Sequence, residues 1–547
     1  MATHAVINQP PHLEPYDLYG TDPVLGDAVA VQGGAADDHL LADFGARVGT
    51  EEVFGWGFDA NRYPPELTTH DRFGHRVDEV AYHPSYHALM DLSVSEGLHC
   101  LHYERPPGEG GYVTRSALFY MMSQVEAGHT CPISMTSSVL PALRHQADLA
   151  AVWEPRVIGR TYDPMLIDPD DKAGVLLGMG MTEKQGGSDV RANTTTAVAV
   201  NGGGPGSEYR LTGHKWFTSA PMCDAFLVLA QAPGGLSCFL LPRVLPNGSR
   251  NNLAVMRLKD KLGNRSNASS EVEFDATAAW MVGEEGRGVR TIIEMVNGTR
   301  LDCVIGSAGL MRQAVAQAGW HVAHRTAFGS SLVDKPLMQN VLADLEIEAE
   351  VATMMMVRLA GAFDRAAIDP EEAAFARIAT PVAKYWVTKR CSPVVRESME
   401  CLGGAGYVEE SILPRLFRES PVNAIWEGSG NVIALDLLRA MASAPEAVKV
   451  FLTEVDGTRG TEPRLDAALD RVRRTIEDLS DPEAEARRLI EQLALAWGGA
   501  LVVAHGDPAV ADAFVRSRLD GDWGALFGTL PPQADVAAIA RRAVPRV

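Results

Sequence analysis

The hydrophobic periodicity of this chain changes twice, and this constrains its fold more than any other feature. Up to about residue 180 the apolar residues follow the pattern of helices broken by proline and glycine. From Thr194 apolar and polar residues alternate, and short β runs follow at 209–211, 225–230, 238–241, 253–258 and 272–274. After Gly286 the spacing is again helical, most clearly from Val341 to Phe363. The pattern predicts a helical region, then a small antiparallel sheet or barrel, then a helical bundle.

The length of 547 residues also exceeds what one hydrophobic core supports, so three or four domains are expected. Residues 443–445 and 457–463 look like linkers, and a new helical pattern follows from Leu465 to Leu479. We therefore expect an α+β, mainly helical fold with four domains. These are an N-terminal helical domain at 1–180, a middle β domain at 181–285, a helical bundle at 286–445 and a C-terminal helical extension at 446–547.

Charge, cysteine usage and hydropathy exclude several classes of protein. No run approaches the roughly 20 apolar residues that span a bilayer, and the N-terminus lacks a signal sequence, so we expect a cytoplasmic protein without membrane contact. The seven cysteines are scattered singly, which predicts reduced core thiols and no metal site. A net charge of −21 argues against general affinity for nucleic acids. Arginines do cluster after residue 470, although a solvated helix face carries such charge equally well.

Three motifs carry groups suited to binding and catalysis. Residues 178–189 form a small-residue loop with hydroxyls at Thr182 and Ser188, and residues 213–219 place an indole and a hydroxyl at a strand end. Residues 425–431 place the carboxylate of Glu427 beside a glycine turn. Each motif alone is equally well explained as an ordinary turn or loop.

Together, in order and spacing, the three motifs resemble the acyl-CoA dehydrogenase flavoprotein superfamily. The amino-acid sequences of 181–189, 259–270 and 426–431, together with the long C-terminal extension, resemble the AidB branch of this superfamily. That branch contains the adaptive-response flavoproteins linked to DNA alkylation damage. This resemblance implies bound FAD, weak dehydrogenation of acyl-CoA thioesters of isovaleryl type, and a homotetramer. It further implies contact with double-stranded DNA as part of protection from alkylation damage.

The resemblance also assigns roles to single residues. Glu427 matches the catalytic base, and burial would raise its basicity. Arg300 is expected near the reacting end of the pocket, with an interhelix salt bridge as the alternative. Arg325 and Phe328 match residues that a neighbouring subunit supplies to the pyrophosphate. The other expected cofactor contacts are Met179, Met181, Thr182, Gly187, Ser188, Trp216, Phe217, Thr218, Gly404, Ser429 and Asn431.

Two functional hypotheses therefore stay open. In the first, the protein combines weak acyl-CoA dehydrogenase activity with DNA binding through the C-terminal extension. In the second, it is an ordinary acyl-CoA dehydrogenase of fatty-acid or branched-chain metabolism with no DNA role. The arginines expected to contact DNA are Arg439, Arg471, Arg473, Arg474 and Arg518. The excess of carboxylates over basic residues within 446–547 is the main evidence against that contact.

Overall fold

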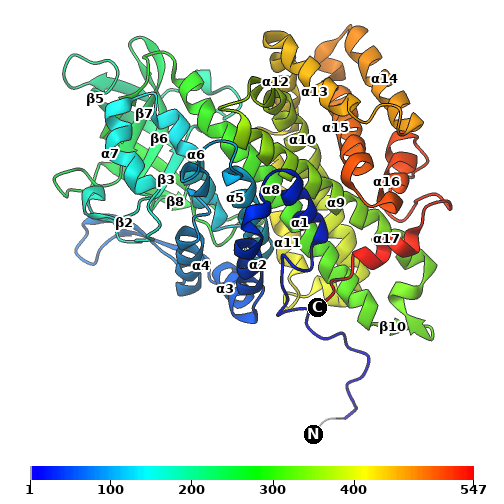
Figure 1. Ribbon diagram of the computed structural model, residues 1–547. Helices are drawn as coiled ribbons and strands as arrows, with labels where there is room; N and C mark the ends of the chain where they lie inside the picture. Colours follow the sequence, from blue (N-terminus) through cyan, green and yellow to red (C-terminus); the bar gives the residue numbers. More distant parts are fainter. Residues whose placement is uncertain (1–2) are drawn as a thin grey trace. The chain divides into compact units, whose positions relative to one another are not determined.

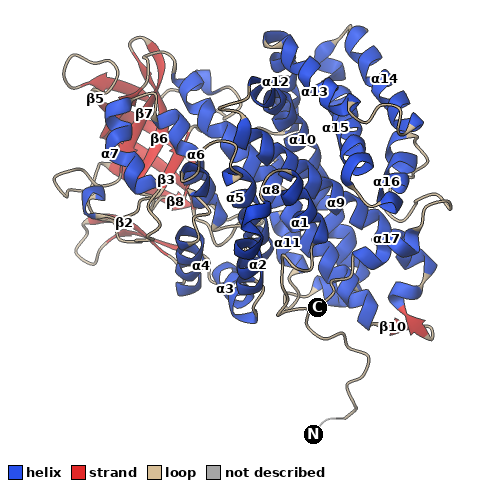
Figure 2. Cartoon of the chain, viewed as in Figure 1, coloured by secondary structure: helices blue, strands red, loops and turns tan. Residues whose placement is uncertain are grey.

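The computed structural model describes residues 3–547, which form two compact units. The first, here called the barrel unit, comprises residues 52–104 and 126–299. The second, the bundle unit, comprises the chain up to Glu51 together with 105–125 and 300–547. Figure 2 shows that the strands concentrate in the barrel unit, whereas the bundle unit is almost entirely helical.

The barrel unit is built on one seven-stranded sheet, in the order β3-β6-β4-β5-β9-β7, with β8 paired to β9. A further pairing of β6 with β7 closes this sheet into a ring, which leaves β3 and β8 outside the closed path. Every β run expected between residues 194 and 274 is confirmed as a strand. The strands are β3 (Leu177–Gly180), β4 (Thr196–Ala199), β5 (Glu208–Ser219), β6 (Ala225–Ala232), β7 (Gly235–Pro242), β8 (Leu253–Leu258) and β9 (Ser269–Val282).

Helices cover this barrel, and α6 packs on it most closely. Met135, Val139 and Leu140 of α6 share one buried core with Phe226 and Leu227 of β6. The helices of the barrel unit are α3 (Glu51–Arg62), α4 (Pro84–Ser95), α6 (Thr130–Leu143), α7 (Ala147–Val157) and the start of α8 (Gly288–His324).

A hairpin of β1 (Glu66–His70) and β2 (Arg76–Ala81) interrupts the N-terminal region that was expected to be helical throughout. Its turn is organised by Asp71, whose carboxylate accepts hydrogen bonds from the backbone N–H groups of Phe73 (2.8 Å) and His75 (2.9 Å). Gly74 adopts a φ of +89°, which an L side chain rarely tolerates. The sequences of these strands, ELTTH and RVDEVA, hold few apolar residues, so no hydrophobic alternation marks them as strands.

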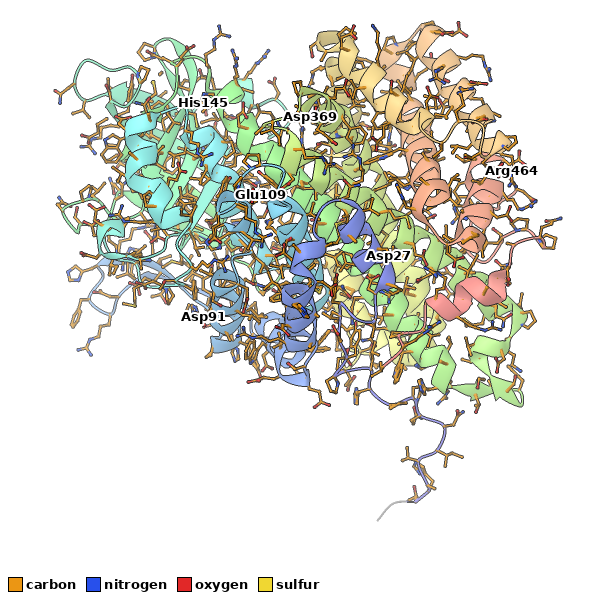
Figure 3. The ribbon with its side chains drawn as sticks, viewed as in Figure 1. Asp27, Asp91, Glu109, His145, Asp369 and Arg464 are labelled. Carbon is orange, nitrogen blue, oxygen red and sulfur yellow. The ribbon has the colours of Figure 1, made fainter. Side chains whose placement is uncertain are left out.

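The bundle unit centres on two long antiparallel helices, α9 (Pro336–Arg365) and α10 (Pro370–Cys401). The predicted helix from Val341 to Phe363 is confirmed within α9, and Met354, Met355 and Met356 are buried in the core as expected. Asp369 caps the start of α10, accepting from the N–H of Glu371 at 2.8 Å (Figure 3). Although α8 runs for 37 residues, no helix within residues 3–547 is apolar enough to cross a membrane.

The C-terminal extension belongs to the same compact unit as the bundle. In Figure 1 its orange and red helices lie against the bundle helices, and α15 and α17 both contact α9. Trp497 of α15 packs edge-on against Phe375 and Phe451, with ring centroids 5.5 and 5.8 Å away. The remaining elements of the bundle unit are α1 (Pro23–Val31), α2 (Asp38–Val48), α5 (Gly111–Val125), β10 (Thr326–Ala327), β11 (Ser330–Ser331), α11 (Leu413–Glu419), α12 (Gly430–Ser443), α13 (Pro445–Asp456), α14 (Pro463–Glu477), α15 (Pro482–His505), α16 (Pro508–Phe514) and α17 (Val536–Arg542).

Candidate active site

In the barrel unit, the loop after β3 is fastened to β5. The backbone N–H of Trp216 donates to the carbonyl of Thr182 at 2.8 Å, and the N–H of Lys184 donates to Nε2 of His214 at 3.0 Å. Gly187 closes the loop, because a Cβ there would lie 2.4 Å from Oγ1 of Thr182. The two motifs separated in sequence therefore form one continuous surface in this unit.

A buried ion pair lies beneath this loop and was not identified from the sequence. Nζ of Lys215 lies 2.7 Å from Oε1 of Glu183, and both side chains are fully buried. Glu183 also accepts from Oγ1 of Thr195 at 2.6 Å and from the N–H of Thr194 at 2.7 Å. Burial raises the pKa of Glu183, but the bonds from Lys215, Thr194 and Thr195 outweigh it and hold that pKa well below its usual range. Burial lowers the pKa of Lys215 to about 8.

The surface beside this loop has an unsatisfied donor and exposed aromatic rings. Oγ1 of Thr218 is buried and has no hydrogen-bond partner among the described residues. Gly180 leaves room next to it, since a Cβ there would lie 3.4 Å from that oxygen. Phe217 is 51% exposed, and Nζ of Lys259 lies 3.3 Å from the centre of the Trp216 ring. A buried hydroxyl without a partner, flat rings and a cation suit a planar, polar, anionic heterocycle.

The residues of the barrel unit that were predicted to contact the cofactor differ in their exposure to solvent. Met179 is 8% exposed and belongs to the hydrophobic core of the barrel, whereas Met181 and Thr182 are half-buried. Gly187 and Ser188 are exposed on the loop. The structure thus places Thr182, Trp216 and Thr218 close together and directs Met179 largely inward.

In the bundle unit, Glu427 occupies a strained turn. Its φ is +56°, the left-handed region, which costs a residue other than glycine about 1–3 kcal/mol. Nζ of Lys384 donates to the carbonyls on either side of it, at 2.7 Å to Trp426 and 2.6 Å to Gly428. Nε of Arg300 donates to the carbonyl of Glu427 itself at 3.0 Å. Two buried cations therefore hold three consecutive carbonyls of this turn.

Arg300 lies beside Glu427, as expected, but its guanidinium has structural partners. It forms an ion pair with Asp436 of α12 at 2.9 Å, and Asp436 also pairs with Arg377 of α10 at 3.3 Å. Arg300 therefore lies next to Glu427 and also forms the interhelix salt bridge that was the alternative interpretation. Trp426 is held separately, because its Nε1 donates to Oδ1 of Asn423 at 2.9 Å.

The start of α12 directly follows this turn and can accept an anion. Ser429 is the residue that precedes the helix, and its side chain makes no capping hydrogen bond. Ser429 and Asn431 are both exposed. A Cβ at Gly430 would lie 2.5 Å from Cε of Lys389 and 3.4 Å from the guanidinium of Arg487, so two cations face this helix end. Free N–H groups and nearby cations form a suitable environment for a phosphate.

Three other expected cofactor contacts lie apart from the Glu427 turn. The guanidinium of Arg325 bonds the carbonyl of Asn8. Phe328 projects from the hairpin of β10 and β11 and is 98% exposed. Gly404 lies on an exposed turn after α10. The role predicted for Arg325 and Phe328 at a neighbouring subunit stays a prediction.

The arginines expected to contact DNA fall into three groups: one is buried, one is paired on the surface, and three are exposed without an ion pair. Arg518 cannot contact phosphates, because its side chain is fully buried and paired with Asp344 and Glu348 of α9; that expectation was wrong. Arg473 pairs with Asp456. Arg439, Arg471 and Arg474 are exposed and form no ion pair with any residue in 3–547. Sequence spacing cannot reveal which arginine of a cluster is buried, because that depends on α9.

Comparison with known proteins agrees with the fold and the motifs. The model of the AidB N-terminal domain of adaptive response proteins matches residues 8–164. The acyl-CoA dehydrogenase middle and C-terminal domain models match residues 178–277 and 286–442. The chain is 44% identical to AidB of Escherichia coli (strain K12) over 95% of both chains. It is 30% identical to acyl-CoA dehydrogenase family member 11 of Caenorhabditis elegans, over 86% of this chain and 81% of that one.

Solved structures extend the likeness to the C-terminal extension. The crystal structure of Caenorhabditis elegans ACDH-11 in complex with C11-CoA superposes with a TM-score of 0.84 at 27% identity, covering 99% of this chain and 92% of that one. The apo form of Bd2924 gives a TM-score of 0.83 at 28% identity and covers 92% of this chain. The extension is therefore part of a fold shared by these proteins.

Proposed function

This chain belongs to the AidB branch of the acyl-CoA dehydrogenase family, and on that premise we propose that it binds FAD and oxidises acyl-CoA thioesters with Glu427 as the base. The observation that carries this proposal is the strained, cation-held turn at Glu427. Backbone strain of this kind persists only where the surroundings impose it, and it concentrates at functional sites. The C11-CoA bound to ACDH-11 supports a thioester of coenzyme A as the ligand class.

The chemistry assigned to this chain is proton abstraction. The Glu427 carboxylate takes the α-proton of the thioester, the electron pair of that C–H bond forms the Cα=Cβ double bond, and the β-hydrogen leaves as hydride. When bound, FAD supplies the acceptor for that hydride. Because backbone contacts hold the base in place, less orientational entropy is lost on reaching the transition state, which lowers the barrier.

The residues that would hold FAD come from the features described above. Thr218 would donate or accept through its unsatisfied hydroxyl, Trp216 would pack against the ring system, and Thr182 would bond its polar edge. Considered within the bundle unit alone, the start of α12 at Gly430, which faces Lys389 and Arg487, suits a phosphate group. The exposed Phe328 and Leu337 (84%) support the homotetramer that the family resemblance implies.

Replacement of Glu427 by glutamine tests the enzyme function. We expect Glu427→Gln to keep FAD and to lose about 10²–10⁴-fold in the rate of flavin bleaching by acyl-CoA, because the amide keeps the shape but cannot take a proton. Anaerobic absorbance at the flavin band, with a panel of thioesters, measures this. The exposed Glu410→Gln is the matched control and should bleach like the wild type. Equal bleaching by Glu427→Gln would remove Glu427 as the base.

We also propose a second function, binding of duplex DNA, which rests on the exposed Arg439, Arg471 and Arg474, none of which forms an ion pair within residues 3–547, although Arg471 donates to the carbonyl of Leu519. Reversing all three to glutamate should weaken binding of any sequence alike, since phosphate contacts do not read bases. The slope of log K against log salt should flatten by about three units. Reversal of Arg62, Arg72 and Arg191, exposed in the barrel unit, changes the net charge equally and serves as the control. If fluorescence anisotropy showed no DNA binding at low salt, acyl-CoA dehydrogenation would be the only proposed function left.

A further inference from the structure

We propose that Lys384 is a positioning residue for the catalytic base: its ammonium holds residues 426–428 in the conformation that directs the Glu427 carboxylate. This inference rests on the proposed function of Glu427. Lys384 lies on α10, 42 positions before the nearest carbonyl it binds, and no sequence motif marks it.

Lys384 contacts the backbone on both sides of Glu427, the proposed base. Its side chain is 1% exposed, and its Nζ donates to Trp426 O at 2.7 Å and to Gly428 O at 2.6 Å, bracketing Glu427 on both sides. Arg300 completes the set through the carbonyl of Glu427 at 3.0 Å.

The left-handed conformation of Glu427 explains why the hydrogen bonds from Lys384 are needed. A residue with a Cβ leaves this region readily unless its surroundings oppose the change. The two peptides that flank Glu427 carry the carbonyl of Trp426, bound by Lys384, and the carbonyl of Glu427, bound by Arg300. Rotation of these peptides would remove an acceptor from each buried cation, which is unfavourable. The carboxylate direction is thereby coupled to the lysine. A displacement of about 1 Å at a reacting group can reduce the rate about 100-fold.

The charge of Lys384 also acts on the base directly. Burial lowers the pKa of Lys384, while attraction to Cys303 and Glu427 raises it and repulsion from Arg300 and Lys389 lowers it further. By reciprocity, the ammonium favours the charged form of the Glu427 carboxylate. Removing the ammonium should therefore move the acid limb of the kcat profile to higher pH, because the base must be deprotonated to act.

The experiment compares Lys384→Met with Lys449→Met in FAD-loaded full-length protein. Lys449, on α13 of the same unit, is 70% exposed and pairs only with Glu446, so its replacement removes one charge without touching the turn. We expect Lys384→Met to lower kcat about 100-fold with little change in KM, and to shift the acid limb to higher pH. Lys449→Met should match the wild type. A purely structural role would lower stability and flavin content without moving the pH limb.

Two further measurements keep the outcomes separate. In the Glu427→Gln background, Lys384→Met should cause no additional loss, because both act through one carboxylate. A crystal structure of Lys384→Met should show φ of Glu427 outside the left-handed region. Unchanged kcat and pH limb, or a retained φ, would overturn the role of Lys384 while leaving the base assignment intact. Full activity of Glu427→Gln would overturn the proposed function itself.

Discussion

Glu183 shows how one residue of a recognised motif can have a role that the motif does not reveal. It lies inside the glycine-rich loop, where an exposed ligand contact would be expected, yet its side chain is fully buried against Lys215. The ion pair joins the loop to β5 and so fixes Thr182 relative to Trp216. Breaking a buried pair on one side is costly, because the remaining charge has no partner.

Glu183→Gln tests this anchoring. We expect a loss of about 3–5 kcal/mol at neutral pH together with weaker FAD retention. The folded-state pKa of Glu183 lies below its unfolded value, so its stabilisation is present above about pH 4.3 and is lost as pH falls through the folded pKa. The difference in Tm between wild type and variant should therefore shrink below about pH 4. Calorimetry measures it.

The control for that experiment lies on β5, the strand that carries Lys215. Glu208 pairs with Arg210 at 2.7 Å, but its side chain is 34% exposed. Glu208→Gln should cost less than about 1 kcal/mol, because water screens the pair. Equal destabilisation by the two variants would contradict the anchoring role of Glu183.

At the scale of elements, α9 organises the C-terminal extension through a row of buried carboxylates. Asp344 and Glu348 pair with Arg518, and Glu350 pairs with Arg542 of α17. Arg464 of α14, labelled in Figure 3, bonds Glu462 and Asp512 within the extension itself. Much of the arginine charge after residue 446 is thus neutralised internally, which limits what remains for DNA.

Arg518→Met should release the segment after residue 514 from α9. We expect a loss of about 3 kcal/mol, since Asp344 loses its cation while Arg390 still pairs with Glu348 at 3.0 Å. Hydrogen exchange should accelerate in residues 515–547 before it does in α9. Arg516→Met is the matched control, because Arg516 is 35% exposed and pairs with Asp512 four residues earlier. Unchanged exchange in Arg518→Met would contradict the docking role.

At the scale of the whole molecule, buried carboxylates contribute to the pH dependence of stability in opposite directions, because burial raises the pKa of some and ion pairs lower the pKa of others. Burial raises the pKa of Glu346 to about 8, against the lowering effect of Arg312. The unfolded chain gives up this proton near pH 4.3. Between these values Glu346 holds its proton in the folded state but not in the unfolded state, so the contribution of Glu346 to stability falls as pH rises.

Glu346→Gln should flatten this profile. We expect the variant to gain stability over the wild type as pH rises from 5 towards 8, because it never ionises. Glu348, two positions along α9, is the opposite case: despite its burial, Arg390 and Arg518 lower its pKa to about 2. Glu348→Gln should therefore lose stability throughout that range. Thermal denaturation at constant ionic strength measures the stability of both variants. If Glu346→Gln lost stability relative to the wild type as pH rises, the raised pKa assigned to Glu346 would be contradicted.

The sequence by itself determined the order of elements and the family. Alternation after Thr194 predicted the strands that now form the barrel, and the three-and-four spacing from Val341 predicted α9. Both are local signals, since each depends on residues within a few positions of one another. The three motifs identified the family for the same reason, because each motif is continuous in sequence.

The tertiary structure alone decided which side chains face one another and which are buried. The pairing of β5 with β9 in the barrel, the burial of Arg518 against α9, and the contact of Lys384 with the Glu427 turn all join distant segments. The sequence suggested Arg518 and Arg474 alike as DNA contacts, yet one is buried and the other exposed. Burial and charge pairing arise from long-range packing, so no local pattern contains them.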